Sequence, residues 1–300
     1  MNISNIPYIK YVRVIEENRD VMRYCRKDIH ECDVFPVGCI FKAFLAILVG
    51  NAILEGKINS INDCIIDYVQ HEDDFDANWY SVKIKHALSK TTGLRWPGPN
   101  VALPANMSEV LKLSFDSKPG ESFQYKPDPQ IIVYLLEEIY RTEITELFRK
   151  KVVAAFRHQD YEWDSCDIEG MRVSPDMLCE LGGLLLNKGS INGKRLFSEE
   201  YYKEMVTPYS DGGFPECCRY GLGVWIDKDD DRDIVKATGF GGQILSVDPR
   251  SKQVVCILSD MDRPHPENRN VMFELLSSSE QGGIRTCLQC SGSYVHVLAV

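Results

Sequence analysis

Cys39 and Lys42 carry the clearest potential chemistry in this chain of 300 residues. They begin an apolar segment and stand three positions apart, a spacing that puts two side chains on one helix face with Cβ atoms about 5–6 Å apart. Lys42 is the only charged side chain from Gly38 to Leu54. We therefore expect it to be buried, and burial lowers the pKa of a lysine. A thiol beside such an amine suits acyl transfer, because the amine can remove the proton or, as an ammonium, stabilise the thiolate.

A structural explanation of this pair stays open. Cys39 could be an ordinary buried thiol, and the Lys42 stem could pack in the core while its amine reaches solvent. The predicted place of Cys39 in a first helical turn favours a thiolate, because the helix dipole stabilises negative charge there. Spacing alone favours the structural explanation, so the decision depends on the rest of the chain.

The hydrophobic pattern indicates β-structure at both ends and helices between them. Residues 8–14 and 20–26 predict a hairpin, and from Tyr220 onward the apolar period is two, which is typical of antiparallel strands. The pattern predicts helices over residues 39–56, 82–88, 129–151, 177–187 and 270–276, the one over 129–151 from apolar residues at helical spacing. The order predicts an α+β fold, an antiparallel sheet flanked by helices plus an inserted all-helical region. We expect a discontinuous sheet domain (1–60 and 168–276), a helical region (61–167) and a loosely attached tail (277–300).

Composition limits the partners of the protein. With 34 basic and 44 acidic residues, the net charge is −10 and the sequence pI is about 5.2. Such a surface repels phosphate backbones and anionic lipids, so we expect neither nucleic-acid nor membrane binding. The first residues lack the pattern of a secretory signal, which predicts a cytoplasmic protein with reduced cysteines. The oligomeric state stays open.

We expect neither a metal nor any other cofactor. Cys287, Cys290 and His296 offer at most three zinc ligands at an unconvincing spacing. The glycines of Gly239–Gly242 lie in a strand pattern, unlike the loop between a strand and a helix that cradles phosphates.

Five segments, in order, resemble the serine β-lactamase and penicillin-binding-protein superfamily, particularly its class C β-lactamase and esterase branch. That family carries Ser-x-x-Lys at the start of a buried helix, and the corresponding segment here reads GCIFKAFLAILVG. The later segments are IKHALSKTTGL, KPGESFQYKP, VSPDMLCELGGLLLNKGSINGKRLFSEE with YGLGVWI, and ATGFGGQILSVDP. The resemblance covers residues 8–276 and implies the β-lactamase/transpeptidase-like fold.

The resemblance also implies roles for individual residues. Cys39 takes the position of the nucleophile, Lys42 that of the lysine that activates it, and Tyr125 that of the residue that carries a proton to the leaving group. The backbone N–H groups of Cys39 and Phe240 would form the oxyanion hole. The segment Ala237–Gly239, which includes Thr238, would form one wall of the site.

This sequence departs from the family pattern at several of these positions. Cys39 replaces the serine, and Pro127 replaces the asparagine of Tyr-x-Asn. Ala237 replaces the lysine or histidine that recognises a substrate carboxylate. Lys90 and Gly241 are further departures, and we expect Lys126 and Asp128 to be solvated loop charges. The departures argue against β-lactam hydrolysis and against D-Ala-D-Ala peptidase activity.

A cysteine nucleophile would form a thioester acyl-enzyme, which reacts more readily with amines than an ester does. The sequence therefore predicts a cytoplasmic acyl-transfer enzyme that acts on a small amide, ester or thioester. Its partners would be an acyl donor and, where transfer replaces hydrolysis, an amine acceptor, in a biosynthetic role. Two alternatives stay open: an inactive binding protein of the same fold, and a serine hydrolase trapped by a Ser→Cys substitution.

Overall fold

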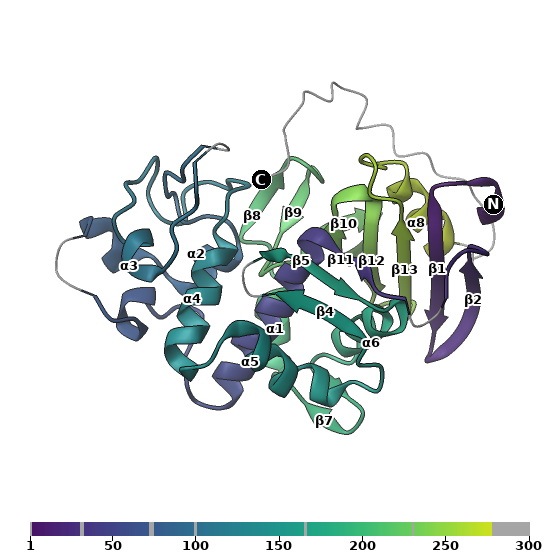
Figure 1. The fold of residues 1–300 in the computed structure, drawn as a ribbon, viewed down its shortest axis with the longest axis horizontal. Helices are drawn as coiled ribbons and strands as arrows, with labels where there is room; N and C mark the ends of the chain where they lie inside the picture. Colours follow the sequence, from purple (N-terminus) through teal and green to yellow (C-terminus); the bar gives the residue numbers. More distant parts are fainter. Residues whose placement is uncertain are drawn as a thin grey trace.

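An eight-stranded antiparallel sheet organises the fold (Figure 1). The computed structural model describes residues 2–30, 33–71, 75–98, 101–164, 167–229 and 231–277. The strand order is β2-β1-β13-β12-β11-β10-β9-β8. The strands are β1 (Ile9–Glu16), β2 (Arg19–Cys25), β8 (Ser210–Gly213), β9 (Cys218–Tyr220), β10 (Trp225–Asp229), β11 (Arg232–Gly239), β12 (Gln243–Asp248) and β13 (Gln253–Ser259). The predicted tail and its cysteines lie outside the described residues.

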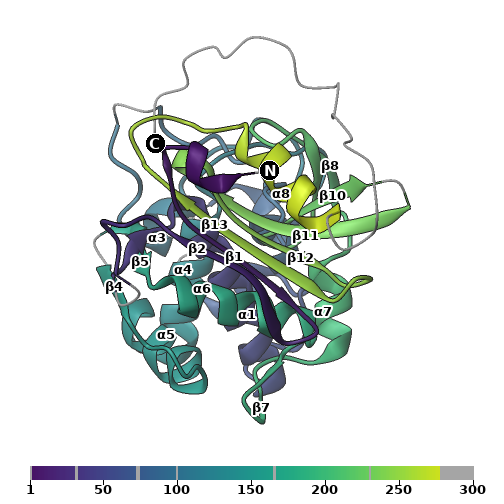
Figure 2. The ribbon, with the colours of Figure 1, turned by 90° about the vertical axis from the view of Figure 1, so that its right-hand side faces the viewer.

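The N-terminal strand β1 lies beside the C-terminal strand β13 in this sheet (Figure 2). The predicted hairpin is confirmed: β1 pairs with β2 through a tight turn in which Glu17 and Asn18 have positive φ. On its other edge β1 pairs with β13. The two ends of the described chain therefore build one sheet, as the pattern at both ends predicts.

Helices cover both faces of this sheet. On β11, Val235 and Ala237 belong to the core that includes α1 (Phe41–Leu54) and α6 (Pro175–Leu186), whereas Ile234 belongs to the core that includes α8 (Asn268–Ser277). Because side chains alternate along a strand, odd positions of this part of β11 face α1 and even positions face α8. These helices confirm the helical segments predicted over residues 39–56, 177–187 and 270–276.

Helix α1 lies between the sheet and the helical region (Figure 1). Its residues from Phe41 to Ala52 are all buried, Lys42 included. The helical region consists of α2 (Ile84–Leu88), α3 (Met107–Val110), α4 (Pro129–Tyr140) and α5 (Ile144–Lys151), with shorter 3₁₀ turns. Helices α4 and α5 both pack on α1.

Two local predictions were wrong. The single helix expected over 129–151 is divided into α4 and α5, because Arg141 adopts a left-handed conformation (φ 50°) that ends α4. The region expected to be all-helical (61–167) contains the strand β4 (Tyr161–Asp164). This strand pairs with β5 (Asp167–Val173), which pairs with β3 (Phe35–Pro36). The three strands form a small second sheet, and β3 lies just before Cys39 in the sequence.

Candidate active site

Cys39 lies in a 3₁₀ turn (Gly38–Ile40) that leads directly into α1. This turn packs tightly against the end of β11. A Cβ atom on Gly38, whose φ is +49°, would lie 3.2 Å from the backbone nitrogen of Phe240, and one on Gly239 would lie 2.0 Å from the Val37 carbonyl oxygen. Glycine at both positions therefore lets the Cys39 turn approach the Phe240 amide.

Lys42 and Tyr125 meet beside this turn. Lys42 is 5% exposed, and its Nζ donates a hydrogen bond of 3.2 Å to the Tyr125 hydroxyl oxygen. The Cys39 thiol is close enough to act electrostatically on both the Lys42 amine and the Tyr125 hydroxyl. Cys39 and Tyr125 are 86 positions apart in the sequence. The fold nevertheless brings them together with Lys42 in one cluster.

The charge of Lys42 differs from the prediction made from burial alone. Burial opposes the charged amine, but electrostatic interactions, that with Cys39 first among them, outweigh this effect. The pKa of Lys42 is therefore raised above its ordinary value rather than lowered. Lys42 is an ammonium at neutral pH, so it fits the second of the two roles considered for it, stabilisation of the thiolate.

Tyr125 is a neutral hydroxyl at this site. Burial of the hydroxyl and its interaction with the nearby Cys39 raise the pKa of Tyr125 well above its usual range. Its ring stacks on Trp225 with 6.2 Å between ring centroids, and Phe123 packs beside both rings. The side chain as a whole is 38% exposed. Tyr125 therefore contacts the buried Lys42 amine through its hydroxyl and the Phe123 and Trp225 rings through its own ring.

Lys90 is a second lysine in this cluster, and no role was predicted for it from the sequence. It is 1% exposed, and its Nζ lies 4.4 Å from the centroid of the Tyr125 ring. The same ring lies 4.8 Å from Lys42 Nζ. Burial and the charge of Lys42 lower the pKa of Lys90 to about 7. The signal that could have indicated it is the position of Lys90 inside the SKTTGL segment of the family resemblance.

The expectation that Asp128 is a solvated loop charge was wrong. Asp128 is 1% exposed, accepts hydrogen bonds from Thr92 Oγ1 (2.9 Å) and Trp96 Nε1 (2.6 Å), and stands at the start of α4. Burial raises its pKa, although the Lys90 charge and these donors oppose the rise. The neighbouring Pro127 brings no side-chain amide, and the buried Asp128 carboxylate one residue later is engaged by Thr92 and Trp96.

The segment Ala237–Gly239 faces the Cys39 turn without a cation. Ala237 is buried on the α1 side of β11, followed by the partly exposed Thr238 and Gly239, and then by Phe240 with 46% exposure. Gly241 is buried with φ +78°. The adjacent Lys236 does not supply the missing charge, because it lies on the opposite face, where its Nζ pairs with Glu216 (2.7 Å) and Asp227 (2.8 Å).

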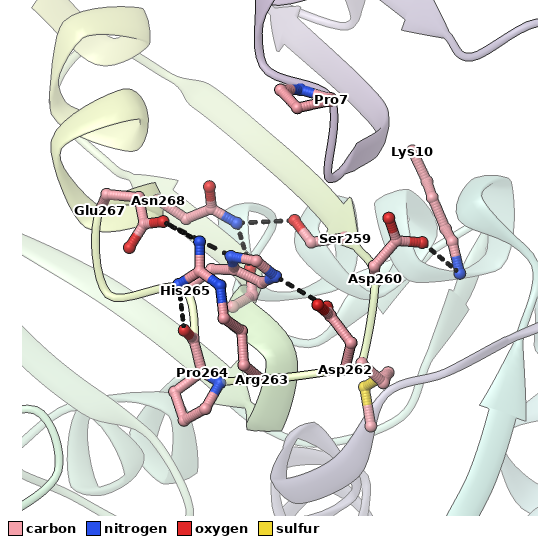
Figure 3. A network of polar contacts seen from close by, with 12 residues as sticks. Pro7, Lys10, Ser259, Asp260, Asp262, Arg263, Pro264, His265, Glu267 and Asn268 are labelled. Atoms are coloured by element: carbon pink, nitrogen blue, oxygen red, sulfur yellow. Dashed lines mark hydrogen bonds and ion pairs between the residues drawn. The ribbon is translucent and has the colours of Figure 1, made fainter.

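A polar network holds the turn that follows Phe240 (Figure 3). Asn268, at the start of α8, donates to the Gly242 carbonyl oxygen (2.9 Å) and to Ser259 Oγ (2.7 Å). The buried His265 lies between Asp262 and Glu267 in the same connection. Helix α8 and the end of β13 therefore fix the backbone that presents the Phe240 amide.

Two hollows differ in their relation to this cluster. A cleft of about 280 Å³ is lined by Thr91 and Phe123, neighbours of Lys90 and Tyr125, together with Tyr209. A larger one of about 720 Å³ lies beside α6 and includes none of the predicted site residues. The smaller cleft is not lined by Cys39, Lys42 or Tyr125 either, but Thr91 follows Lys90 in the chain and the Phe123 ring packs beside Tyr125. We therefore take it as the candidate substrate entrance.

Within the described ranges, no three His, Cys, Asp or Glu side chains are grouped as a metal site would require. Among the helices of those same ranges, none has the length and apolar character needed to cross a bilayer.

Solved structures share this architecture. A putative β-lactamase from Bacteroides dorei superimposes with a TM-score of 0.77 and 15% identity, over 92% of this chain and 94% of that one. A putative 6-aminohexanoate-dimer hydrolase from Bacillus anthracis gives a TM-score of 0.74 and 15% identity, over 91% and 79%. A family VIII carboxylesterase gives 0.72 and 14%, over 91% and 93%. A search of curated protein sequences found no significant match.

The fold and the position of the Cys-x-x-Lys segment at the start of α1 define a β-lactamase-like protein. The sequence profile of the Beta-lactamase family matches residues 14–276, so the chain belongs to that family. The resemblance inferred from the five motifs and the predicted fold class are both confirmed. Membership of this family, with a hydrolase and an esterase among the similar structures, supports hydrolase activity.

Proposed function

We propose that the protein is an acyl-transfer enzyme in which Cys39 is the nucleophile. The observation that supports this most is the meeting of three groups: Cys39, the Lys42 ammonium, and the Tyr125 hydroxyl 3.2 Å from Lys42 Nζ. A thiolate held beside an ammonium is ready to attack a carbonyl carbon without a separate base.

The proposed reaction has two steps. The Cys39 thiolate attacks the carbonyl carbon, and the oxyanion that forms is stabilised by the N–H groups of Cys39 and Phe240. The tetrahedral intermediate then releases the leaving group, which takes a proton from Tyr125, and Tyr125 regains a proton from Lys42. The product is a thioester on Cys39. Water or an amine next attacks this thioester, its proton passes through Tyr125 to Lys42, and the Cys39 thiolate departs, giving an acid or an amide and restoring the starting state.

The wall formed by Ala237 and Thr238 limits the substrate class. Because Ala237 brings no cation and Lys236 is engaged on the other face of the sheet, the site does not select a carboxylate next to the scissile bond. We propose a small amide, ester or thioester as acyl donor, which fits the volume of the nearby cleft. No disulfide joins the seven cysteines within the described ranges, which agrees with the proposed cytoplasmic setting and a biosynthetic role.

The test is covalent labelling followed by intact-mass measurement. The protein is mixed with a panel of activated esters, alkyl thioesters and β-lactams, and the adduct is located by peptide mapping. We expect one acyl group on Cys39 and none in Cys39→Ala, while Cys217→Ala, which removes an exposed thiol, is the matched control. Brief treatment with limiting iodoacetamide should likewise modify Cys39 first.

The same experiment separates the alternatives. A Cys39 that forms no adduct and reacts no faster with iodoacetamide than Cys217 would contradict the proposal and favour a binding protein of this fold. A stable adduct that neither water nor an added amine releases would favour the trapped serine-hydrolase variant.

A further inference from the structure

Lys90 combines two unfavourable features in one residue. Its side chain is 1% exposed, and its backbone has a φ of +60°. A buried amine loses hydration, and a side chain other than glycine is strained in the left-handed region. Residues with such strain persist where the surrounding structure fixes them, and they are concentrated at functional sites.

The surroundings that fix Lys90 belong to the Tyr125 segment. Lys90 Nζ donates a hydrogen bond of 2.7 Å to the Lys126 carbonyl oxygen, and the Gln124 N–H donates one of 2.8 Å to the Lys90 carbonyl oxygen. One side chain and one backbone contact of Lys90 therefore hold the residues on both sides of Tyr125. Lys90 thus helps to position Tyr125, and Pro127, which has no side-chain amide, offers no such contact.

Lys90 also faces every charged group of the cluster. Its amine lies 4.4 Å from the Tyr125 ring centroid. The ionisable groups that act on it come from four different elements and are Lys42, Cys39, Asp128 and Glu169. Asp128 already accepts bonds from Thr92 and Trp96. Burial and the Lys42 charge place the pKa of Lys90 at about 7, so this amine changes charge near neutrality while Lys42 keeps its own.

We propose that Lys90 is a positioning residue of the acyl-transfer site: it holds the Tyr125 segment through the Lys126 carbonyl, and its charge controls proton donation by Tyr125. This inference rests on the proposed function. A charged Lys90 stabilises both the Cys39 thiolate and the phenolate left when Tyr125 gives up its proton. When pH rises through about 7, Lys90 becomes neutral and this stabilisation is lost. Acylation by a donor with a poor leaving group then becomes slower.

Two substitutions separate the two parts of this role. Lys90→Gln keeps a donor for the Lys126 carbonyl but cannot titrate, whereas Lys90→Met loses both. Lys126→Gln is the matched control, because it removes a neighbouring charge and keeps the carbonyl that Lys90 contacts. Acylation of Cys39 by an alkyl ester is followed by quenched-flow mass spectrometry between about pH 6 and pH 9, the range in which a group with this pKa titrates.

In the unsubstituted protein and in Lys126→Gln, we expect the acylation rate to decrease as pH rises through about 7. Lys90→Gln should lack this decrease. Lys90→Met should lack it too and be slower by about 10- to 100-fold, since loss of positioning alone costs that much. Thermal unfolding of each variant checks the fold, and Lys90→Gln carries the test if Lys90→Met does not fold.

The rate of Cys39 alkylation by iodoacetamide over the same pH range tests Lys90 without turnover. If no ester or thioester acylates Cys39, the proposed function fails, and a pH step in alkylation that Lys90→Gln removes still supports the charge role of Lys90. Identical pH profiles in the unsubstituted protein, Lys90→Gln and Lys90→Met would overturn the inference, even where acylation of Cys39 is rapid.

Discussion

Replacement of Tyr125 by phenylalanine separates proton donation from packing. The change removes only the hydroxyl that accepts from Lys42 Nζ at 3.2 Å, while the ring keeps its contacts with Trp225 and Phe123. A positioned proton donor contributes about 10²- to 10⁴-fold to the rate, which corresponds to about 3–5 kcal/mol of activation free energy. We expect a loss of this size for donors whose leaving group must be protonated.

The leaving group supplies the internal control. An alkoxide needs a proton to depart, whereas a 4-nitrophenolate departs without one. Tyr125→Phe should therefore slow acylation by an alkyl ester strongly and acylation by a 4-nitrophenyl ester little, with both measured as acyl-Cys39 formation. Loss of one hydrogen bond to a buried ammonium costs about 1–3 kcal/mol of unfolding free energy, which urea unfolding checks. Equal slowing of both donors, or of neither, would refute the role of Tyr125 as proton donor.

Three further outcomes follow from the contacts around the site. Lys236→Met breaks the ion pairs with Glu216 and Asp227, but Asp227 keeps its ion pair with Arg269. We expect the free energy of unfolding in urea to fall by about 3 kcal/mol, the lower end for a broken buried pair. The rate of Cys39 alkylation should be unchanged. Asn268→Ala removes the donor to the Gly242 carbonyl, so acylation of Cys39 should slow more than its alkylation does, because only acylation needs the Phe240 amide. In the folded protein the pKa of Lys90 is about 7, below the ordinary lysine value of 10.5. Between these two pH values the unfolded chain binds more protons than the folded protein, so the free energy of unfolding should rise with pH over this range. In Lys90→Met we expect a smaller rise.

Local patterns predicted the elements whose formation depends on nearby residues. The hairpin β1–β2, the buried helix α1 and the strands after Tyr220 follow from periods of two and 3.6 residues and from turn residues within a short window. The break between α4 and α5 has no such signal, because arginine is rarely left-handed and nothing near Arg141 requires it. Strand β4 was missed because its partner β5 lies in a segment that also lacks clear alternation.

The candidate site was predicted where the family resemblance supplied positions, and missed where burial depends on distant segments. Cys39, Lys42 and Tyr125 carry motifs that could be read directly. Asp128 reads as a loop charge, and only the packing of Thr92 and Trp96 against it, more than 30 positions earlier in the chain, makes it a buried acceptor. Its role depends on tertiary contacts that no local window contains.

Lys42 and Lys90 show why burial alone could not predict the charges of the site. Both are almost fully buried, at 5% and 1% exposure, and both lie within 5 Å of the Tyr125 ring centroid. Burial lowers the pKa of both amines, but the interaction of Lys42 with Cys39 outweighs burial, so the pKa of Lys42 rises. Lys90 has the Lys42 ammonium nearby, which adds to the effect of burial, so the pKa of Lys90 falls. Burial acts in the same direction on both lysines, and the neighbouring charges decide whether it is outweighed. One fixed ammonium and one amine that titrates near neutrality give Tyr125 both a proton source and a charge that changes with pH.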